Sequence, residues 1–331
     1  MRSGKTLILA TKEFAKENKV KSWWYLLSTV FLLIAAQLCS FQLEHIILKI
    51  VFSIITSLMI VRMFMIYHDH QHKAILAKSK AASVIMYVYG LYILAPSSIW
   101  KRSHDHHHKH NSKLFSASIG SYPIMTKQKF LNSSKAERFA YLAVRHPLNI
   151  LFGYFSVFMY GMCINSFLSS PSKHYDSLIA LVLHLTMASL LFWLGGWTAM
   201  LLTWIIPFSI TCAIGAYLFY AQHNFPGVTF KNNIEWSYDH AALESSSYMK
   251  MSPLMNWFTG NIGYHHIHHI NAHIPFYRLP EAMHKIPELQ AVTATSWHPR
   301  DIISCLKLKV WDSETKRMLG LNELRQDPAY N

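Results

Sequence analysis

Histidine is concentrated in three short clusters of this chain, and each cluster adjoins a long apolar segment. The sequence has 331 residues and 21 histidines. The clusters occupy residues 67–72, 103–110 and 264–269, and His273 follows the third. Imidazole is the commonest protein ligand for middle and late transition metals near neutral pH. The pattern therefore predicts a metal centre assembled at the edge of a membrane.

The composition is too apolar for a typical soluble enzyme. Charged residues make up 15% and hydrophobic residues 52% of the chain, and the mean hydropathy is +0.16, whereas a soluble domain carries about 25% charged residues. The net charge of +14 does not indicate nucleic-acid binding, because the lysines flank apolar runs and form no basic stripe with interleaved aromatic residues. Such flanking charge is typical of the cytoplasmic side of membrane proteins.

The cysteines argue against a disulfide framework or a thiolate metal site, and the N-terminus argues against a secretory signal. The four cysteines are far apart in sequence and form no CxxC pair: Cys39, Cys163, Cys212 and Cys305. They indicate neither a disulfide framework nor a thiolate metal site. Residues 1–22 are rich in lysine and arginine and too polar for a secretory signal. We expect this segment to be a cytoplasmic, amphipathic lead-in to the first membrane span.

Several apolar runs approach the roughly 20 residues that a spanning helix needs. Residues 23–43 and 50–67 predict a helical hairpin that delivers the first histidine cluster to the starting side. Residues 149–168 predict another span, and residues 178–197 and 200–221 follow with Gly195 and Gly196 between them. The run 83–99 is shorter and contains Gly90 and Pro96, so we expect it to lie along the interface or to re-enter the membrane.

Charge places the clusters on the cytoplasmic side, but the number of crossings raises a difficulty. Lysine and arginine are abundant in residues 68–147, whereas residues 169–176 contain only Lys173; this asymmetry favours a cytoplasmic location for the clusters and the N-terminus. An even number of crossings must then separate the second and third clusters, yet three apolar runs lie between them. One of 178–197 and 200–221 is therefore not a full span, or the two form a kinked, partly embedded unit.

The remainder of the chain, residues 222–331, has no run long enough to cross a membrane. We expect it to form a cytoplasmic cap that carries the third cluster. The sequence contains no internal repeat and no low-complexity tract. The expected fold is thus an all-α integral membrane protein with about four transmembrane helices, in which residues 1–331 form a single domain.

The spacing within the clusters suits metal binding from helices. The pairs and triplets are His68 and His72; His104, His107 and His108; and His265, His268 and His269. Residues at i, i+3 and i+4 project from one face of a helix, so each set can aim its imidazoles at a common point. His223 adds a histidine where the last apolar run ends.

Other residues of the clusters are open to two interpretations. The histidines His70, His106, His110, His266 and His273 are either support for the ligands or surface residues. Asp69 and Asp105 either accept the distal N–H of a ligand imidazole, a common arrangement in metal sites, or are ordinary solvated acids.

The three patterns HxxxH, HxxHH and HxxHH, in this order and in this membrane context, resemble the membrane fatty-acid desaturases. The resemblance extends from about Tyr67 to Ala282. It includes the flanks of the second box, the segments 222–226 and 235–236, and the sequence IPFYRLPEA at 274–282, which is similar to the acyl-lipid desaturases. The three boxes together are specific, whereas any one alone is not.

The resemblance implies a non-haem di-iron centre and an oxygen-dependent desaturation of a fatty acyl chain that is linked to a lipid or a carrier. The implied iron ligands are the histidines of the boxes together with His223: His68, His72, His104, His107, His108, His223, His265, His268 and His269. The sequence departs from many relatives at His70 and His266, which leaves the ligand set open at those two boxes.

The electron donor is expected to be a separate protein such as ferredoxin or cytochrome b5. The chain has no HPGG motif of the cytochrome b5 type and no cysteine array for an iron–sulfur cluster. A basic face around Lys101, Arg102, Lys109 and Lys113 suits an acidic donor, and it suits lipid headgroups equally well.

Two other functions compete with desaturation. A hydroxylase or ketolase acting on a lipid or carotenoid would use the same centre, and the boxes do not separate these outcomes. A metal transporter or a loose metal-scavenging tract is the other alternative. Transport needs ionisable ligands at mid-membrane depth, and among the histidines only His184 lies well inside a predicted span.

Overall fold

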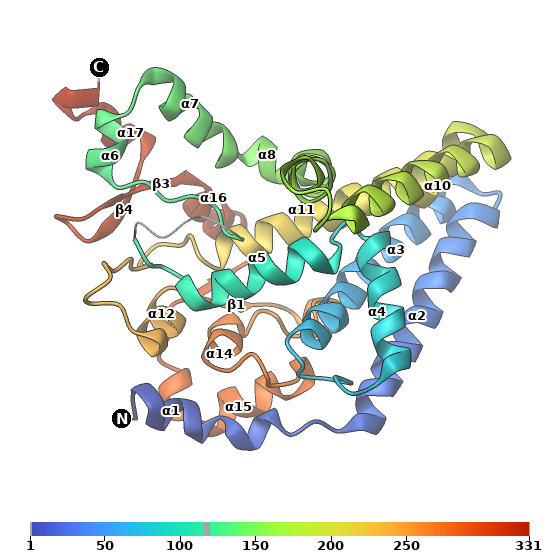
Figure 1. Ribbon diagram of the computed structural model, residues 1–331, viewed down its shortest axis with the longest axis horizontal. Coiled ribbons are helices and arrows are strands. Elements are labelled where there is room, and N and C mark those ends of the chain that lie inside the picture. Colours follow the sequence, from blue (N-terminus) through green and yellow to red (C-terminus); the bar gives the residue numbers. More distant parts are fainter. Residues whose placement is uncertain (1, 115–119, 331) are drawn as a thin grey trace.

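The computed structural model describes residues 2–114 and 120–330, and these residues are mostly helical (Figure 1). The first half of the helical part comprises α1 (Gly4–Ala10), η1 (Lys12–Ala15), α2 (Lys19–Gln42), α3 (Ile46–Gln71), α4 (Lys80–Tyr92), α5 (Ser97–His110), α6 (Lys127–Asn132), α7 (Lys135–Val144), α8 (Pro147–Leu151), the π-helix η2 (Tyr154–Asn165) and α9 (Ser166–Ser169).

The second half contains two long helical stretches followed by short elements. They are α10 (Tyr175–Met200), the π-helix η3 (Leu201–Ile205), α11 (Ile206–Ala221), α12 (Tyr238–Glu244), α13 (Pro253–Phe258), α14 (His265–Ile270), η4 (Phe276–Arg278), α15 (Leu279–Lys285), η5 (Pro287–Leu289), α16 (Pro299–Lys307), α17 (Leu321–Arg325) and η6 (Pro328–Tyr330). Two small sheets pair β1 (Tyr248–Lys250) with β2 (Ala294–Ser296) in parallel and β3 (Leu308–Asp312) with β4 (Arg317–Gly320) in antiparallel register.

The helices α2 and α3 form the hairpin that the apolar pattern predicts. The Asn18 side chain caps α2 by accepting the backbone N–H of Lys21 at 3.1 Å, which is why the helix begins before the apolar run. The buried positions of α2 recur every three or four residues: Ser22, Leu26, Thr29, Leu33, Ala36 and Ser40. This spacing forms one packing stripe. The remaining face leaves Trp24 and Phe31 largely exposed, so it suits contact with lipid.

The stretch Tyr175–Ala221 is a second hairpin. Its 47 residues would extend about 70 Å as one straight helix, more than twice the roughly 30 Å of a bilayer's hydrocarbon core. The helix breaks at Gly195 and Gly196, where Gly196 has φ 65° and ψ −161°, a conformation that only glycine adopts readily. The break lies beside Phe41 at the far end of α2. The chain then returns through η3 and α11 toward the second and third histidine clusters.

Residues 149–168 do not form the straight span that their hydropathy predicts. They comprise part of α8, the π-helix η2 and part of α9. In Figure 1 this green helix next to α8 is seen end-on, whereas α2, α3 and α10 lie in the plane of the picture. Both ends of this segment lie near the helices that carry the histidines. Arg145, which precedes it, bonds Asn224 just after α11, and His174, which follows it, bonds Ser98 in α5. Hydropathy reports that a segment is buried in lipid or protein, not the direction in which it runs.

This orientation of residues 149–168 agrees with an even number of crossings between the second and third clusters. The two arms of the α10–α11 hairpin form the long apolar stretch between these clusters, and the segment 149–168 lies across them. The clusters thus share one side of the molecule. Among the described residues, three helical stretches are long and apolar enough to cross a membrane. The 47-residue stretch is broken at Gly195 and Gly196 into two arms, which with α2 and α3 agree with the predicted fold class.

The predicted interfacial segment forms α4 and the start of α5. The two helices are bent by 93°, with Leu94 at φ 57° in the turn. The Tyr67 hydroxyl donates to the Ala95 carbonyl at 2.9 Å and packs against Gly90, where a Cβ atom would lie 3.1 Å from the phenol oxygen. This close approach fixes α5, which carries the second histidine box, against the end of α3.

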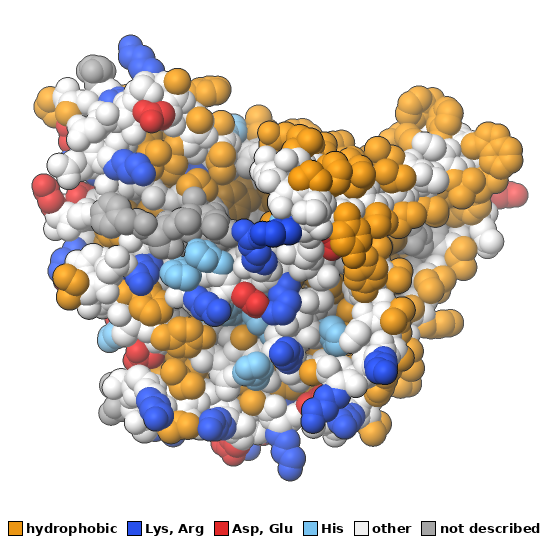
Figure 2. All heavy atoms as spheres, viewed as in Figure 1, with side chains coloured by type: hydrophobic (Ala, Val, Ile, Leu, Met, Phe, Trp, Pro, Cys, Tyr) orange, Lys and Arg blue, Asp and Glu red, His pale blue; other side chains and the backbone are white. Residues whose placement is uncertain are grey.

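The N-terminal residues hold the C-terminal cap in place over the clusters. Asn271, just after the third box, donates to Thr11, and the Leu76 N–H, just after the first box, donates to Glu17. Arg2 forms a two-pronged ion pair with Glu288. Figure 2 shows hydrophobic side chains along the right-hand edge, over α2 and α10, and charged side chains over the face that carries α5. The molecule therefore has a lipid-facing part and a polar part.

Candidate metal centre

Five of the predicted histidines converge in one group. The end of α3 supplies His68, and His72 directly follows this helix. The helix α5 supplies His104 and His108, and α14 supplies His268. The Nε2 atoms of His68 and His104 are 3.0 Å apart, those of His104 and His108 are 3.1 Å apart, and those of His108 and His268 are 3.0 Å apart. One nitrogen of each of the five lies within 4.8 Å of the others.

The other four form a second group beside the first. It contains His107 from α5, His223 just after α11, and His265 and His269 from α14. The Nε2 atoms of His107 and His223 are 3.0 Å apart, those of His223 and His265 are 2.9 Å apart, and those of His265 and His269 are 3.1 Å apart. All nine histidines predicted as ligands are therefore brought together, and none is left outside.

The structure changes one expectation about the triplets, because each triplet serves both groups. In α5, His104 and His108, at i and i+4, enter the five-histidine group, whereas His107 enters the four-histidine group. In α14 the assignment is reversed, since only His268 enters the five-histidine group. Adjacent residues of a helix point about 100° apart. Adjacent histidines at the end of each HxxHH box therefore diverge toward two different points.

The donor atoms of both groups fit metal ions. Two ring nitrogens that each lie about 2.1 Å from one ion at right angles are about 3.0 Å apart, which matches the Nε2 separations. A contact between two neutral imidazoles holds only one N–H, which pairs one donor nitrogen with one acceptor nitrogen. Several ring nitrogens that face one point therefore need a cation between them. In addition, Nε2 of His72 is buried and has no hydrogen-bond partner within the described structure.

The comparisons with known proteins identify the family. A model of the fatty acid desaturase family matches residues 45–300. The chain belongs to the fatty acid desaturase family. The desaturase is 27% identical over 283 residues to a fatty acid desaturase of Bacillus subtilis (strain 168), covering 85% of this chain and 80% of that protein.

Two cyanobacterial proteins are similar at lower identity. The sn-1 acyl-lipid omega-3 desaturase (ferredoxin) of Nostoc sp. (strain 36) is 22% identical over 83% of this chain and 77% of its own length. The sn-1 oleoyl-lipid 12-desaturase of Synechocystis sp. is 21% identical over 65% of this chain and 62% of its own length. The resemblance seen in the histidine boxes is therefore confirmed: the chain is a membrane enzyme that desaturates fatty acids, with histidine groups that suit metal binding.

Hydrogen bonds outside the two groups orient two of the desaturase's histidines. Asp69 accepts from the Phe276 N–H at 2.7 Å and lies 3.1 Å from Nδ1 of His68. This bond directs Nε2 of His68 into the five-histidine group, as carboxylates do in metal sites. Of the two acids considered from the sequence, only Asp69 contacts a ligand candidate in this way. Asp105 instead pairs with Lys101 at 2.5 Å.

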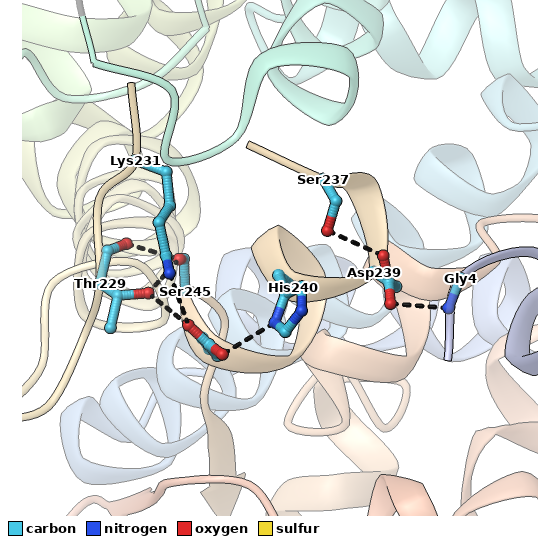
Figure 3. A network of polar contacts seen from close by, with 8 residues as sticks. Gly4, Thr229, Lys231, Ser237, Asp239, His240 and Ser245 are labelled. Atoms are coloured by element: carbon cyan, nitrogen blue, oxygen red, sulfur yellow. Dashed lines mark hydrogen bonds and ion pairs between the residues drawn. The ribbon is translucent and has the colours of Figure 1, made fainter. Parts of the chain in front are cut away.

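The loop after α11 holds His223. Its Nδ1 donates to the Ser245 carbonyl at 2.9 Å, which leaves Nε2 as the acceptor that faces the group. Figure 3 shows how Ser245 is itself fixed: its hydroxyl donates to the Thr229 carbonyl, and the side chain of Thr229 donates to Glu244. Sequence reasoning missed this support, because a backbone carbonyl that orients a ligand leaves no residue-type signal.

The same network ties α12 to the N-terminus. In Figure 3, His240 contacts Glu244 and Asp239 accepts the Gly4 N–H; these distances are 2.9 and 2.7 Å. Lys231 is 4.0 Å from Glu244. The position of His223 therefore depends on a set of bonds that reaches across the cap.

The remaining histidines of the clusters lie outside both groups. His70 contacts the Ile75 carbonyl, and His266 donates from Nε2 to the Leu289 carbonyl at 3.0 Å. The rings of His106 and His110 stack with centroids 4.1 Å apart. His273 is exposed. None of them contributes a nitrogen to either group.

Burial keeps the cap's histidines that belong to the two groups neutral. It lowers the pKa of His223 to about 4, although the bond to Ser245 opposes the shift. Burial, together with the neighbouring imidazoles, also holds the pKa of His265, His268 and His269 well below the ordinary value. Neutral imidazole is the form that binds metal. The arrangement is therefore ready for metal binding at neutral pH without a proton having to leave.

Proposed function

We propose that this desaturase introduces a double bond into a lipid-linked or carrier-linked fatty acyl chain, using two iron ions, dioxygen and electrons from a separate protein. Each turnover removes two hydrogen atoms from adjacent methylene groups. These hydrogens, with two donor electrons and two protons from water, reduce one dioxygen to two water molecules. The observation that carries the proposal is the convergence of nine histidines into two nitrogen-only groups beside apolar helices.

In this proposal the five-histidine group holds one iron and the four-histidine group holds the other. Imidazole nitrogen suits iron among the transition metals, and the four cysteines belong to neither group. When bound, the irons supply the reduction of dioxygen and the oxidising power to break an unactivated C–H bond, which acid–base side chains cannot provide.

The chain's own residues orient the donors and exclude water. Asp69 and the Ser245 carbonyl each fix one imidazole, which also raises the basicity of the ligand. In the third box His265, His268 and His269 are at most 3% exposed. A dry, preorganised site favours reaction with the acyl chain over reaction with water.

The names of the relatives support an acyl lipid as the substrate class. Two of them are named for acyl-lipid or oleoyl-lipid desaturation, and one name includes ferredoxin. The exposed apolar faces of α2 and α10 are where a lipid would approach. A separate electron donor, ferredoxin or cytochrome b5, agrees with the isolated cysteines and the absence of an HPGG motif in the sequence.

The arrangement of charge supports a cytoplasmic location for the N-terminus, the histidine groups and the cap. The turns at the far end of the two hairpins, residues 43–45 and 195–196, contain no lysine or arginine. Positive charge is concentrated at the other end, as the charge rule for cytoplasmic loops requires. We infer further that residues 1–22, the membrane helices and residues 222–331 act as one domain around one site.

The test is a comparison of fatty-acid esters from a bacterial host that expresses the wild type or His268→Ala together with a ferredoxin system. Gas chromatography–mass spectrometry should show a new unsaturated chain with the wild type alone, and the position of its double bond gives the regiochemistry. A hydroxylated chain would replace the proposal with a hydroxylase. Purified wild type without bound iron, or with exchangeable zinc or copper, would overturn the di-iron centre.

A further inference from the structure

The five-histidine group comes nearest to the surface at His72. This residue is only partly buried, whereas the other four members of the group are buried. Lys101, Asp105 and His273 lie near it. His72 therefore lies between the metal-binding group and a charged part of the surface.

Positive side chains surround this point. Lys73 directly follows His72 and is exposed, and α5 presents Arg102 and Lys109 to solvent while its box histidines face inward. A shallow hollow along the outer side of α5 is lined by basic residues, with one acid that pairs with Lys101, two serines and two histidines: Lys101, Arg102, Lys109, Asp105, Ser97, Ser98, His106 and His110. In Figure 2 lysine and arginine side chains gather over this face, and acidic side chains are few.

We propose that the face formed by Lys73, Lys101, Arg102 and Lys109 is the docking surface for the electron donor, a small acidic redox protein, and that electrons enter the site at His72. This inference rests on the proposed function. Each reduced donor gives one electron and leaves oxidised, so two encounters supply the two electrons of one turnover, and dioxygen is the final acceptor. Complementary charge would steer the donor to this face.

The extent of the surface favours a protein over a lipid headgroup. The start of α5 contacts α10 through Ser98 and Asp176, and Lys109 lies about 16 Å further along the helix from Ser98. A headgroup held at the edge of the lipid-facing part reaches one end of this surface, not both. A protein partner can cover the whole length of α5 and His72 together.

The test compares two triple variants that remove the same charge. The docking variant carries Lys73→Gln, Arg102→Gln and Lys109→Gln, and the control carries Lys307→Gln, Lys316→Gln and Arg325→Gln. All six residues are exposed, and none forms an ion pair within the described parts of the chain. The probe is a plant-type [2Fe–2S] ferredoxin, added to protein in nanodiscs of phosphatidylcholine at several salt concentrations.

The docking variant should bind ferredoxin about tenfold more weakly at low salt, with a shallower dependence on salt, and the control should match the wild type. The docking variant should also slow ferredoxin oxidation in stopped-flow measurements, while its bound iron stays unchanged. Equal binding by both variants, or wild-type binding that does not respond to salt, would overturn the proposal.

Two further measurements keep this test separate from that of the function itself. Desaturation driven by dithionite should be the same in the wild type and the docking variant, because a chemical reductant needs no docking surface. Lack of product with dithionite in the wild type would count against the proposed function alone, since ferredoxin binding is measured independently. If the docking variant lost only its affinity for phosphatidylglycerol vesicles, the surface would be a lipid site and the inference would be wrong.

Discussion

At the scale of single residues, two histidines of α14 only two positions apart have different surroundings. His268 lies 3.0 Å from His108 within the five-histidine group, whereas His266 bonds the Leu289 carbonyl. His268→Ala should abolish desaturation and lower bound iron, because it removes a nitrogen donor, while membrane insertion stays intact. Iron per protein, measured by plasma mass spectrometry after purification, checks this outcome; a variant with full activity would refute the ligand role.

His266→Gln is the matched control for that prediction. It should keep iron and activity and should lower the free energy of unfolding by about 1 kcal/mol, the usual contribution of one hydrogen bond. Thermal unfolding in detergent gives the stability difference. Loss of iron in this variant would place His266 among the ligands.

Eight of the nine histidines of the two groups could be predicted from the sequence because helical spacing is a local property, and His223 followed from the resemblance to the family. The division of each box between two groups could not, since it depends on how α5 and α14 face each other. The role of the Ser245 carbonyl in orienting His223 could not be predicted from the sequence either. His266 illustrates the same limit, because helical phase alone does not say which side of α14 faces the site.

At the scale of elements, the α10–α11 hairpin depends on the break at Gly196. Gly196→Ala should lower the free energy of unfolding by about 1–3 kcal/mol, because the φ of 65° with a ψ of −161° is strained for residues with a Cβ atom. Gly215→Ala is the control: it lies inside α11, and its added Cβ atom would meet nothing within 4 Å. The control should be neutral or more stable by up to about 1 kcal/mol. Equal melting temperatures would mean that the break tolerates side chains.

The hairpins also show what apolar runs can and cannot predict. The spans of α2 and α3 follow from their length and their lack of charge. Residues 149–168 have the same composition, but the π-helix η2 packs across the bundle. Its orientation is decided by contacts such as Arg145 with Asn224 and His174 with Ser98, which join residues far apart in the sequence.

At the scale of the whole molecule, the orientation of residues 149–168 predicts on which side of the membrane the loops lie. Single cysteines placed at Lys12 and at Lys173 should react with an impermeant maleimide from the same side of the membrane. A cysteine at Glu44 should react from the opposite side. The four native cysteines are first replaced, and intact spheroplasts are compared with inside-out vesicles. Labelling of position 173 from the side of Glu44 would restore residues 149–168 as a span.

Two buried histidines of the cap make the stability of the metal-free protein depend on pH. The pKa of His223 and of His266 is lowered by burial from 6.5 to about 4, so the unfolded chain binds protons between these values while the folded chain does not. The contribution of these two histidines to the free energy of unfolding is therefore full above pH 6.5 and is lost as the pH falls toward about 4. The loss is about 1.4 kcal/mol per unit of pKa shift. Chemical unfolding of the chelator-treated protein from pH 7 to 4 measures this loss; a flat profile would contradict it.

The division of adjacent histidines between the two groups has a consequence for how the enzyme tolerates its surroundings. His107 and His108, and likewise His268 and His269, are covalent neighbours that belong to different groups. The distance between the two groups is thus set by the spacing of neighbouring residues along the chain, in α5 and again in α14. It is not set by the tilt of one helix against another. Changes in bilayer thickness, which alter helix tilt, should leave this internal distance unchanged while the lipid around the protein varies with growth conditions.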